Sequence, residues 1–119
     1  MATRSFICVF EPEQGYRGIY CHYDGYPSHV GRLLVAFHNS LEAANKLVHG
    51  TQICSLDQDG TVARYSSDQA DDSEVFDSIR EALDSGYDYA YLFDNEQWMC
   101  YGPDSGIYPK ITKLYEIPA

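Results

Sequence analysis

Residues 20–31 (YCHYDGYPSHVG) hold the densest group of side chains capable of chemistry. Three tyrosines, two histidines and one aspartate fall within these twelve residues. His22 and Asp24 are suited to act as a general base with its orienting carboxylate, or as two ligands of a metal ion. A hydrogen bond between them that only shapes the turn is the structural alternative. Because no third ligand and no nucleophile stand at a recognisable spacing, we expect no catalytic residue, no bound metal and no cofactor.

A small molecule or a nucleotide is the ligand that this stretch would accept. The stretch joins an expected strand to an expected helix, and the backbone amides at the start of a helix often face a ligand. Asp24-Gly25 is typical of a tight turn in which Gly25 adopts a positive φ. The residues of such a site would be His22, Tyr23, Asp24, Tyr26 and His29.

The negative charge of the chain is concentrated in about one third of it. Twelve acidic and two basic residues lie between Asp57 and Glu96, so this segment accounts for the whole net charge of −10. A helix expected over residues 74–85 would place Asp77, Glu81 and Asp84 on one stripe, at i, i+4 and i+7. Such a stripe is either an ordinary solvated face that keeps the protein soluble or a surface that imitates phosphates and occupies a basic groove.

A divalent-metal cluster is the third interpretation of the acidic segment. Asp68, Asp71 and Asp72 lack the glycine-punctuated ligand order of an EF-hand loop, which argues against it. If the segment binds a partner protein, the contacting residues would be Asp71, Asp72, Glu74, Asp77, Glu81, Asp84 and Asp88. The eleven tyrosines exceed what a small core needs, although core packing explains most of them. Tyrosines and Trp98 are side chains of the kind common in protein-binding surfaces.

The composition is that of one folded domain over residues 1–119, with 45% apolar and 22% charged residues. A net charge of −10 argues against direct binding to nucleic acid or to an anionic membrane, because both attract the opposite sign. No apolar run reaches the roughly 18 residues that a membrane span needs. The first ten residues are too polar for a secretory signal. We therefore expect a cytoplasmic protein whose four cysteines stay reduced.

Apolar periodicity and turn residues predict an α+β domain: a mostly antiparallel sheet with about three helices packed on one face. Strands are expected over residues 4–10, 18–23, 53–56, 61–65, 87–93, 97–101 and 110–117. Helices are expected over residues 27–37, between the N-cap Ser40 and Gly50, and over residues 74–85, where Ser73 or Asp71 would begin the helix. Parallel crossovers are the lesser possibility.

The chain also resembles a family of small bacteriophage and prophage proteins. Those proteins begin with a Thr-Arg-Ser segment, carry a Tyr-Cys-His-Trp-Asp-Gly-Tyr-Pro box, and end in a Tyr-Leu-Phe-Asp hairpin followed by Trp. Here Thr3-Arg4-Ser5, the box at residues 20–27, and residues 91–94 with Trp98 carry the resemblance. The chain departs from the family pattern at Tyr23, where Trp is usual, and at Ser28-His29. The resemblance implies a phage-encoded accessory protein of the host cytoplasm, and it supplies no catalytic residues.

Together these observations predict a binding protein rather than an enzyme. The favoured hypothesis is a counter-defence inhibitor that binds a host nucleic-acid-binding enzyme or complex through an acidic, tyrosine-rich surface. The alternatives are a small-molecule, nucleotide or metal-binding module centred on His22 and Asp24, and a structural or regulatory phage protein without a ligand.

Overall fold

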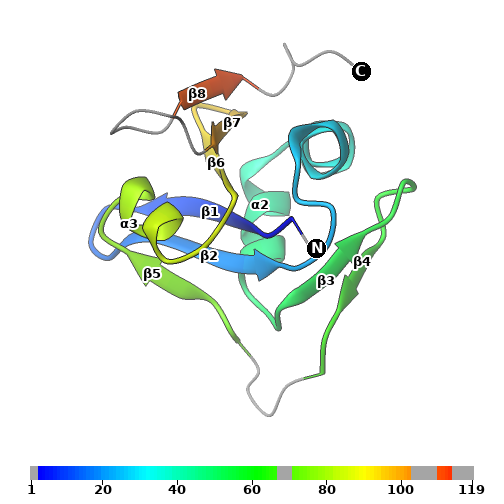
Figure 1. Cartoon of the computed structure of the whole chain (residues 1–119), viewed down its shortest axis with the longest axis horizontal. Coiled ribbons are helices and arrows are strands. Elements are labelled where there is room, and N and C mark those ends of the chain that lie inside the picture. The colour runs from blue at the N-terminus through cyan, green and yellow to red at the C-terminus, as the bar shows by residue number, and fades with distance from the viewer. Residues whose placement is uncertain (1–2, 67–70, 103–109, 114–119) are drawn as a thin grey trace.

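The protein is an α+β domain built on a mixed sheet, as the sequence predicts (Figure 1). The computed structural model describes residues 3–66 and 71–102, together with the backbone of residues 110–113. Strands run in the order β4-β3-β2-β1-β6-β7-β8, and β5 also pairs with β2. The strands are β1 (Ser5–Glu11), β2 (Gly15–Cys21), β3 (Ile53–Leu56), β4 (Val62–Arg64), β5 (Glu74–Phe76), β6 (Tyr89–Asp94), β7 (Gln97–Gly102) and β8 (Lys110–Lys113).

Two antiparallel hairpins form the body of the sheet. In the first, β1 and β2 pair from Ser5↔Cys21 to Glu11↔Gly15. In the second, β6 and β7 pair up to Asp94↔Gln97, which leaves a two-residue turn. The hairpins are joined by parallel pairing of β1 with β6, and β2 is also parallel to β3. The described strand pairs are therefore mostly antiparallel, with the parallel crossovers present as a minority.

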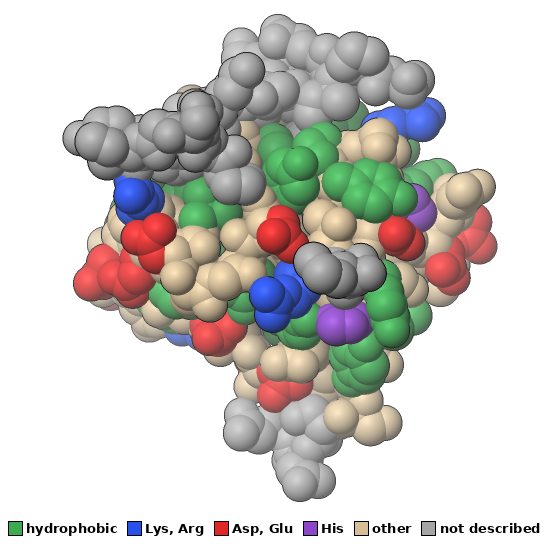
Figure 2. All heavy atoms as spheres, viewed as in Figure 1, with side chains coloured by type: hydrophobic (Ala, Val, Ile, Leu, Met, Phe, Trp, Pro, Cys, Tyr) green, Lys and Arg blue, Asp and Glu red, His purple; other side chains and the backbone are tan. Residues whose placement is uncertain are grey.

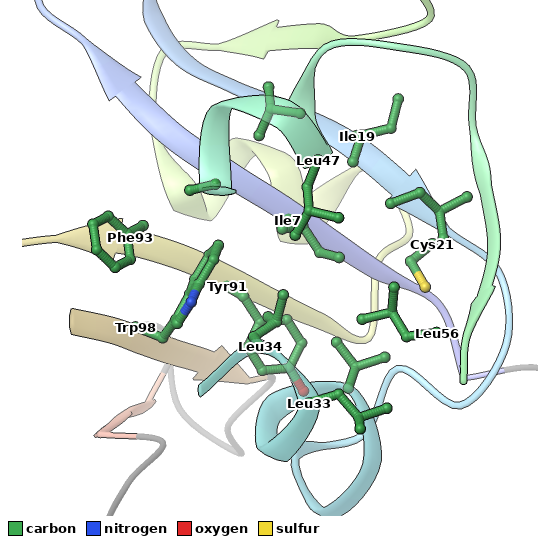
Figure 3. Close-up of a cluster of buried hydrophobic side chains, with 14 of the residues drawn as sticks. Ile7, Ile19, Cys21, Leu33, Leu34, Leu47, Leu56, Tyr91, Phe93 and Trp98 are labelled. Atoms are coloured by element: carbon green, nitrogen blue, oxygen red, sulfur yellow. The ribbon is translucent and has the colours of Figure 1, made fainter. Parts of the chain in front are cut away.

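Two of the three helices cover one face of the sheet. A π-helical turn, η1 (Pro27–Gly31), runs directly into α1 (Arg32–Phe37), and α2 (Leu41–Val48) follows. Ser40 is the N-cap of α2, as expected, because its side chain accepts a hydrogen bond from the amide of Ala43. Figure 3 shows Leu33, Leu34 and Leu47 meeting Tyr91 and Trp98 from the sheet. This aliphatic and aromatic cluster is the main core.

The third helix, α3 (Ile79–Asp84), packs on the opposite face, so the prediction that all three helices share one face is wrong for α3. Figure 1 shows α3 in front of the sheet and α2 behind it. The alternation along β1 explains the arrangement, since its successive side chains point to opposite faces. Ile7 and Val9 belong to the main core, whereas Phe6 and Cys8 pack with Ile79 of α3.

The predicted helix over residues 74–85 is also too long. Glu74–Phe76 is the strand β5, which pairs with β2, and the helix begins only at Ile79. The N-cap is Ser78, whose side chain accepts a hydrogen bond from the amide of Glu81, and not Ser73 or Asp71. Phe76 packs against Phe6 with ring centroids 5.1 Å apart. Tertiary packing of this aromatic ring thus overrides the helical spacing.

The outer edge of β2 is shared by two strands that diverge. Residues 16–18 pair with β5, and Cys21 pairs with Ile53 of β3. The amides of His22 and Tyr23 continue the second pairing by donating to the carbonyls of Ile53 and Cys54, each at 3.0 Å. Figure 1 shows β5 and β3 pointing away from each other below β2. The sheet therefore forks beside Tyr20.

The four cysteines are free, in agreement with the reduced thiols expected from the sequence. Cys8, Cys21 and Cys100 are buried in strands, and Cys54 of β3 is half-buried. Burial raises the pKa of the Cys21 and Cys100 thiols to about 12. They therefore stay protonated at neutral pH and pack as small apolar side chains.

Candidate functional site

The acidic residues predicted to bind a partner lie in two groups. Glu74, Asp77, Glu81, Asp84 and Asp88 lie on α3 or on the segments that flank it. Because Asp77 precedes the helix, the expected helical stripe through Asp77, Glu81 and Asp84 does not form. Figure 2 shows acidic side chains on several separate parts of this view rather than in one block. The α3 side of the molecule thus carries spaced carboxylates.

Three carboxylates of the α3 side hold intramolecular bonds. Glu74 Oε1 accepts from the Tyr87 hydroxyl at 2.7 Å. Asp84 pairs with Arg80 at 3.3 Å across one turn of α3. Asp88 Oδ2 accepts from the backbone amide of Arg4 at 2.9 Å, and this fixes the start of β1 against the strand that follows α3. These three acids therefore have structural roles in addition to their charge.

Asp77 and Glu81 differ from the three others. Both are exposed, and neither carboxylate holds a hydrogen bond or an ion pair with another described residue. Two unpartnered carboxylates can contact a basic surface without breaking any bond within the protein.

Asp71 and Asp72 form the second group, beside the start of β3. Asp71 Oδ2 pairs with His49 Nδ1 at 3.0 Å, and Asp71 Oδ1 accepts from the amide of Ser73 at 2.8 Å. The hydrogen bond to Ser73, followed by the one to His49, holds the pKa of the Asp71 carboxyl well below its usual range. Asp72 Oδ2 accepts from the amide of Gln52 at 3.1 Å. Asp68, the third acid of the metal interpretation, lies outside the described residues.

The five residues predicted as a ligand site are not brought together. The rings of His22 and Tyr23 pack edge to face, with centroids 4.4 Å apart and an interplanar angle of 79°. His29 instead binds the carbonyl of Leu56 through Nε2 at 2.8 Å, with Tyr26 nearby at a centroid distance of 6.1 Å. Asp24 is exposed at the turn between the two pairs. His29 thus has the structural role of holding η1 against β3.

The turn at Asp24-Gly25 also differs from its prediction, because Asp24 and not Gly25 adopts the positive φ, at 56°. Glycine is required at position 25 for space. A Cβ there would lie 2.7 Å from the Thr3 carbonyl oxygen and 2.8 Å from the Ser5 Cβ. No hydrogen bond joins His22 to Asp24 among the described residues, and the Tyr20 hydroxyl is the partner of His22 Nδ1.

A row of rings runs across the α3 side of the sheet to His22. From Phe6 the row continues to Tyr87 at 5.2 Å, from Tyr87 to Tyr20 at 5.8 Å, and from Tyr20 to His22 at 5.6 Å between centroids. The hydroxyl of Tyr20 contacts His22 Nδ1 and lies close to the charge of Arg4. Burial raises the pKa of Tyr20, and the Arg4 charge opposes that rise. The Tyr20 hydroxyl and the His22 ring thus form one polar contact beside Arg4.

A polar hollow of about 330 Å³ lies in the fork of the sheet. Arg4, Tyr20 and Tyr87 line it together with Gln52 of the β3 side and Glu74 of β5. Arg4 and Glu74 carry opposite charges but form no ion pair, in the part of the chain that the structure describes. The hollow thus presents a guanidinium and a carboxylate to the same space.

The sequence analysis predicted none of the residues of this hollow to bind a ligand. It did single out Glu74, but as a residue that contacts a partner protein. The sequence holds one usable signal for it. Ser78 and Glu81 stand in the spacing of a capping box, which places the helix start at Ile79 and releases Glu74 to a strand. Arg4 and Gln52 have no local motif, because their meeting depends on the fork.

Compared with models of protein families, with curated proteins and with solved structures, the chain matches none of them. Within the described residues there is no group of three or more histidine, cysteine, aspartate or glutamate side chains placed to hold a metal ion. Nor does any helix there have the length and apolar character needed to cross a membrane.

Proposed function

We propose that this protein is an interaction protein that binds a basic surface of a host nucleic-acid-binding enzyme or complex, as a phage-encoded counter-defence inhibitor. The observation that carries the proposal is the pair of exposed, unpartnered carboxylates of Asp77 and Glu81. They stand within the segment that holds the whole net charge of −10. The resemblance to small phage proteins supports the biological setting of this proposal.

The physical basis is electrostatic complementarity. Grooves that hold nucleic acid are positively charged, and they attract carboxylates spaced along a surface as they attract phosphates. Glu74, Asp84 and Asp88 add to the negative potential around Asp77 and Glu81 while remaining bonded within the protein. Complementary charges mainly raise the association rate and select the partner, so the interaction should weaken steeply with salt.

The experiment is a pull-down from bacterial lysates with the tagged protein, washed with rising salt and identified by mass spectrometry. Between 0.1 M and 1 M salt the Debye length falls from about 10 Å to about 3 Å, which screens exposed charge pairs. The proposal expects a nucleic-acid-binding protein that elutes in this range. Empty pull-downs from several hosts, or partners that resist high salt, would contradict it.

A pair of matched variants tests whether position matters. Asp77→Asn/Glu81→Gln removes one charge just before α3 and one on its first turn, and Glu13→Gln/Glu42→Gln removes two exposed charges elsewhere. We expect the first variant to weaken binding of the recovered partner by about tenfold or more, and the second to change it little. Equal losses would mean that net charge alone attracts the partner, and the proposed surface would be wrong.

Ligand binding in the fork of the sheet is the second candidate function. It is favoured by the presence of Arg4 and Glu74 in one hollow without an ion pair between them. A ligand with separated opposite charges, such as an amino acid, would satisfy both groups. Tyr20 and Tyr87 would contact its side chain, and His22 would act only by orienting the Tyr20 hydroxyl.

Thermal unfolding with free amino acids and nucleotides tests this candidate. A ligand at about a hundred times its Kd adds about 2.7 kcal/mol to the free energy of unfolding, which raises Tm measurably. Arg4→Gln should abolish the shift, His22→Ala should reduce it, and the control Arg32→Gln on α1 should leave it unchanged. A shift that survives Arg4→Gln would place the ligand elsewhere.

A further inference from the structure

A second hollow, of about 320 Å³, lies between the continuous η1–α1 helix and the turn that joins β3 to β4. Figure 1 shows the tip of the β3–β4 hairpin beside the coil of η1 and α1. The helix lines the hollow with two neighbouring rows of side chains at four-residue spacing, and Gln58 of the turn completes the lining. We call it the α1 hollow and define it by Ser28, Arg32, Leu33, Phe37 and Gln58.

Contacts at both ends hold the walls of the α1 hollow in place. At one end His29 Nε2 binds the Leu56 carbonyl of β3 at 2.8 Å. At the other end Gly60 packs on Phe37, since a Cβ at residue 60 would lie 2.6 Å from Phe37 Cγ. His38 Nε2 also binds the Gly60 carbonyl there, at 3.1 Å. The hollow is therefore formed before a ligand arrives, which lowers the entropy cost of binding.

The charge of the α1 hollow is opposite to that of the chain. Among the described residues that line it, Arg32 is basic and none is acidic, although the whole chain carries a net charge of −10. The Arg32 guanidinium is exposed and forms no hydrogen bond or ion pair with another described residue. Asp57 and Asp59 flank Gln58 in the turn, but neither lines the hollow. Arg32 is therefore free to pair with an anionic group of a ligand, and the Ser28 hydroxyl, one turn earlier, can donate to the same group.

Phe37 gives the same hollow an aromatic wall. Its ring packs on Gly60, yet 51% of its surface is exposed. An aromatic side chain in this position can stack with a planar ring. Gln58 lies two residues before Gly60, and its amide both donates and accepts hydrogen bonds, as the edge of a nucleobase does. The hollow thus offers contacts to a ring, to the edge of that ring and to an anion.

The spacing of Arg32 and Phe37 selects the class of ligand. The two residues are five positions apart, which is about 7.5 Å along a helix axis. A ligand that reaches both must carry its ring and its charge several ångströms apart. In a nucleoside monophosphate the ribose supplies that separation, whereas benzoate carries its charge directly on the ring.

The backbone beside Arg32 points independently to this side of the helix. The Arg32 amide donates to the Pro27 carbonyl, five residues earlier, which makes η1 a π-helical turn. Such turns are rare and frequently lie at functional sites. Ser28 and His29, two of the residues that line the hollow, belong to this turn.

We infer that the α1 hollow binds a nucleoside monophosphate. The phosphate pairs with Arg32 and Ser28, the base packs on Phe37, and the Gln58 amide binds the edge of the base. Of the five residues that the sequence predicts as a ligand site, His29 alone lines this hollow. The inference depends neither on the carboxylates of the α3 side nor on the fork of the sheet.

Calorimetric titration of the full chain with AMP, GMP, CMP and UMP tests this inference. At least one of them should bind about tenfold or more tightly than its own nucleoside and than inorganic phosphate, because each of those lacks one of the two main contacts. Benzoate should bind as weakly as phosphate. The inference is overturned if none of the four nucleotides binds, or if phosphate or benzoate binds as tightly as they do.

Variants of the two walls locate the nucleotide. Arg32→Gln should weaken it by about tenfold or more and leave the weaker binding of the nucleoside unchanged. Phe37→Leu keeps an apolar side chain against Gly60 and should weaken both several-fold. The matched controls, Lys46→Gln on α2 and Phe10→Leu on β1, change exposed side chains elsewhere and should alter neither affinity. A nucleotide that binds Arg32→Gln as well as the unmodified chain would overturn the inference.

Arg4→Gln separates the α1 hollow from the fork of the sheet. It should leave nucleotide binding unchanged, just as Arg32→Gln should leave unchanged the binding of a ligand in the fork. A nucleotide that is lost with Arg4→Gln and retained with Arg32→Gln would lie in the fork and overturn the inference. The Tm of each variant without ligand shows that it is folded.

Discussion

The two faces of the sheet are built differently. The α1–α2 face is closed by large side chains that are at most 2% exposed, among them Ile7, Leu34, Leu47 and Trp98. On the α3 face, buried Phe6 is surrounded by rings that are only partly buried, such as Phe76 and Tyr87. The first face supplies most of the stability. The second leaves hydroxyls and carboxylates at the surface, and there the candidate partner surface and the polar hollow are found.

The prediction with the largest expected effect on the free energy of unfolding compares one aromatic ring from each face. Trp98→Ala should lower the free energy of unfolding by about 3–5 kcal/mol, because it empties a closed site. It also removes the indole N–H that donates to the His38 carbonyl at 3.1 Å. Phe76→Ala should cost clearly less, since that ring is only partly buried. Urea unfolding curves measure both, and equal losses would contradict the division between the faces.

The α3 face is nevertheless tightly packed at one point, where Gly18 meets Phe6. A Cβ at residue 18 would lie 2.4 Å from Phe6 Cζ and 2.7 Å from the Cys8 Cβ. Gly18→Ala should therefore cost about 1–3 kcal/mol through overpacking. Phe6→Leu should recover part of that loss in the double variant. Strictly additive effects in urea unfolding would show that the two side chains do not compete for space.

The start of α3 provides a test of about 1 kcal/mol. Ser78→Ala should cost about as much as Ser40→Ala, since each hydroxyl caps a helix on its own face. Ser73→Ala is the comparison at the start that the sequence spacing indicates; the Ser73 hydroxyl caps no helix and instead accepts a hydrogen bond from Arg17 Nη1 at 3.0 Å. If it costs stability through loss of a helix cap and Ser78→Ala does not, the helix begins where the sequence spacing first indicated. Circular dichroism during urea unfolding measures all three.

The smallest effect is a pH dependence on the α1–α2 face. Burial lowers the pKa of His38, which also binds the Gly60 carbonyl at 3.1 Å. The unfolded chain then binds the proton more readily, so the free energy of unfolding falls as pH drops through the ordinary histidine pKa of about 6.5. His38 is half-open to solvent, so the change is small. His38→Gln should flatten the slope between neutral and mildly acidic pH, and an unchanged slope would assign it to other groups.

Local signals in the sequence predicted most of the fold. Pro27, Ser40 and the Asp94–Glu96 turn mark boundaries that depend on nearby residues, and the structure confirms them. The prediction of a helix for residues 74–76 was wrong because their apolar spacing fits a helix as well as a strand. The outcome was decided by Phe6 and by the free edge of β2, neither of which is near in sequence. The pairing of Ser78 with Glu81 was the local clue that could have corrected it.

The candidate sites were harder to predict than the fold. Residues 20–31 were predicted to form one site. In the structure His22 contacts Tyr20, which lies two residues earlier on the same side of the strand, whereas His29 of η1 binds the Leu56 carbonyl of β3. Glu74 lines the same hollow as Arg4 and Gln52 only because the sheet forks between β5 and β3. Sites assembled from distant strands have no spacing in the sequence from which they can be recognised.

The parallel pairing of β1 with β6 has a consequence for synthesis of the protein. One edge of β1 is covered by its neighbour β2 as soon as the first hairpin forms, but the other waits for residues 89–93. A growing chain therefore carries Ile7 and Val9 beside an open strand edge until most of it has left the ribosome. Truncation before β6 would leave that edge available for pairing between chains, so premature termination should yield aggregates rather than a smaller folded unit.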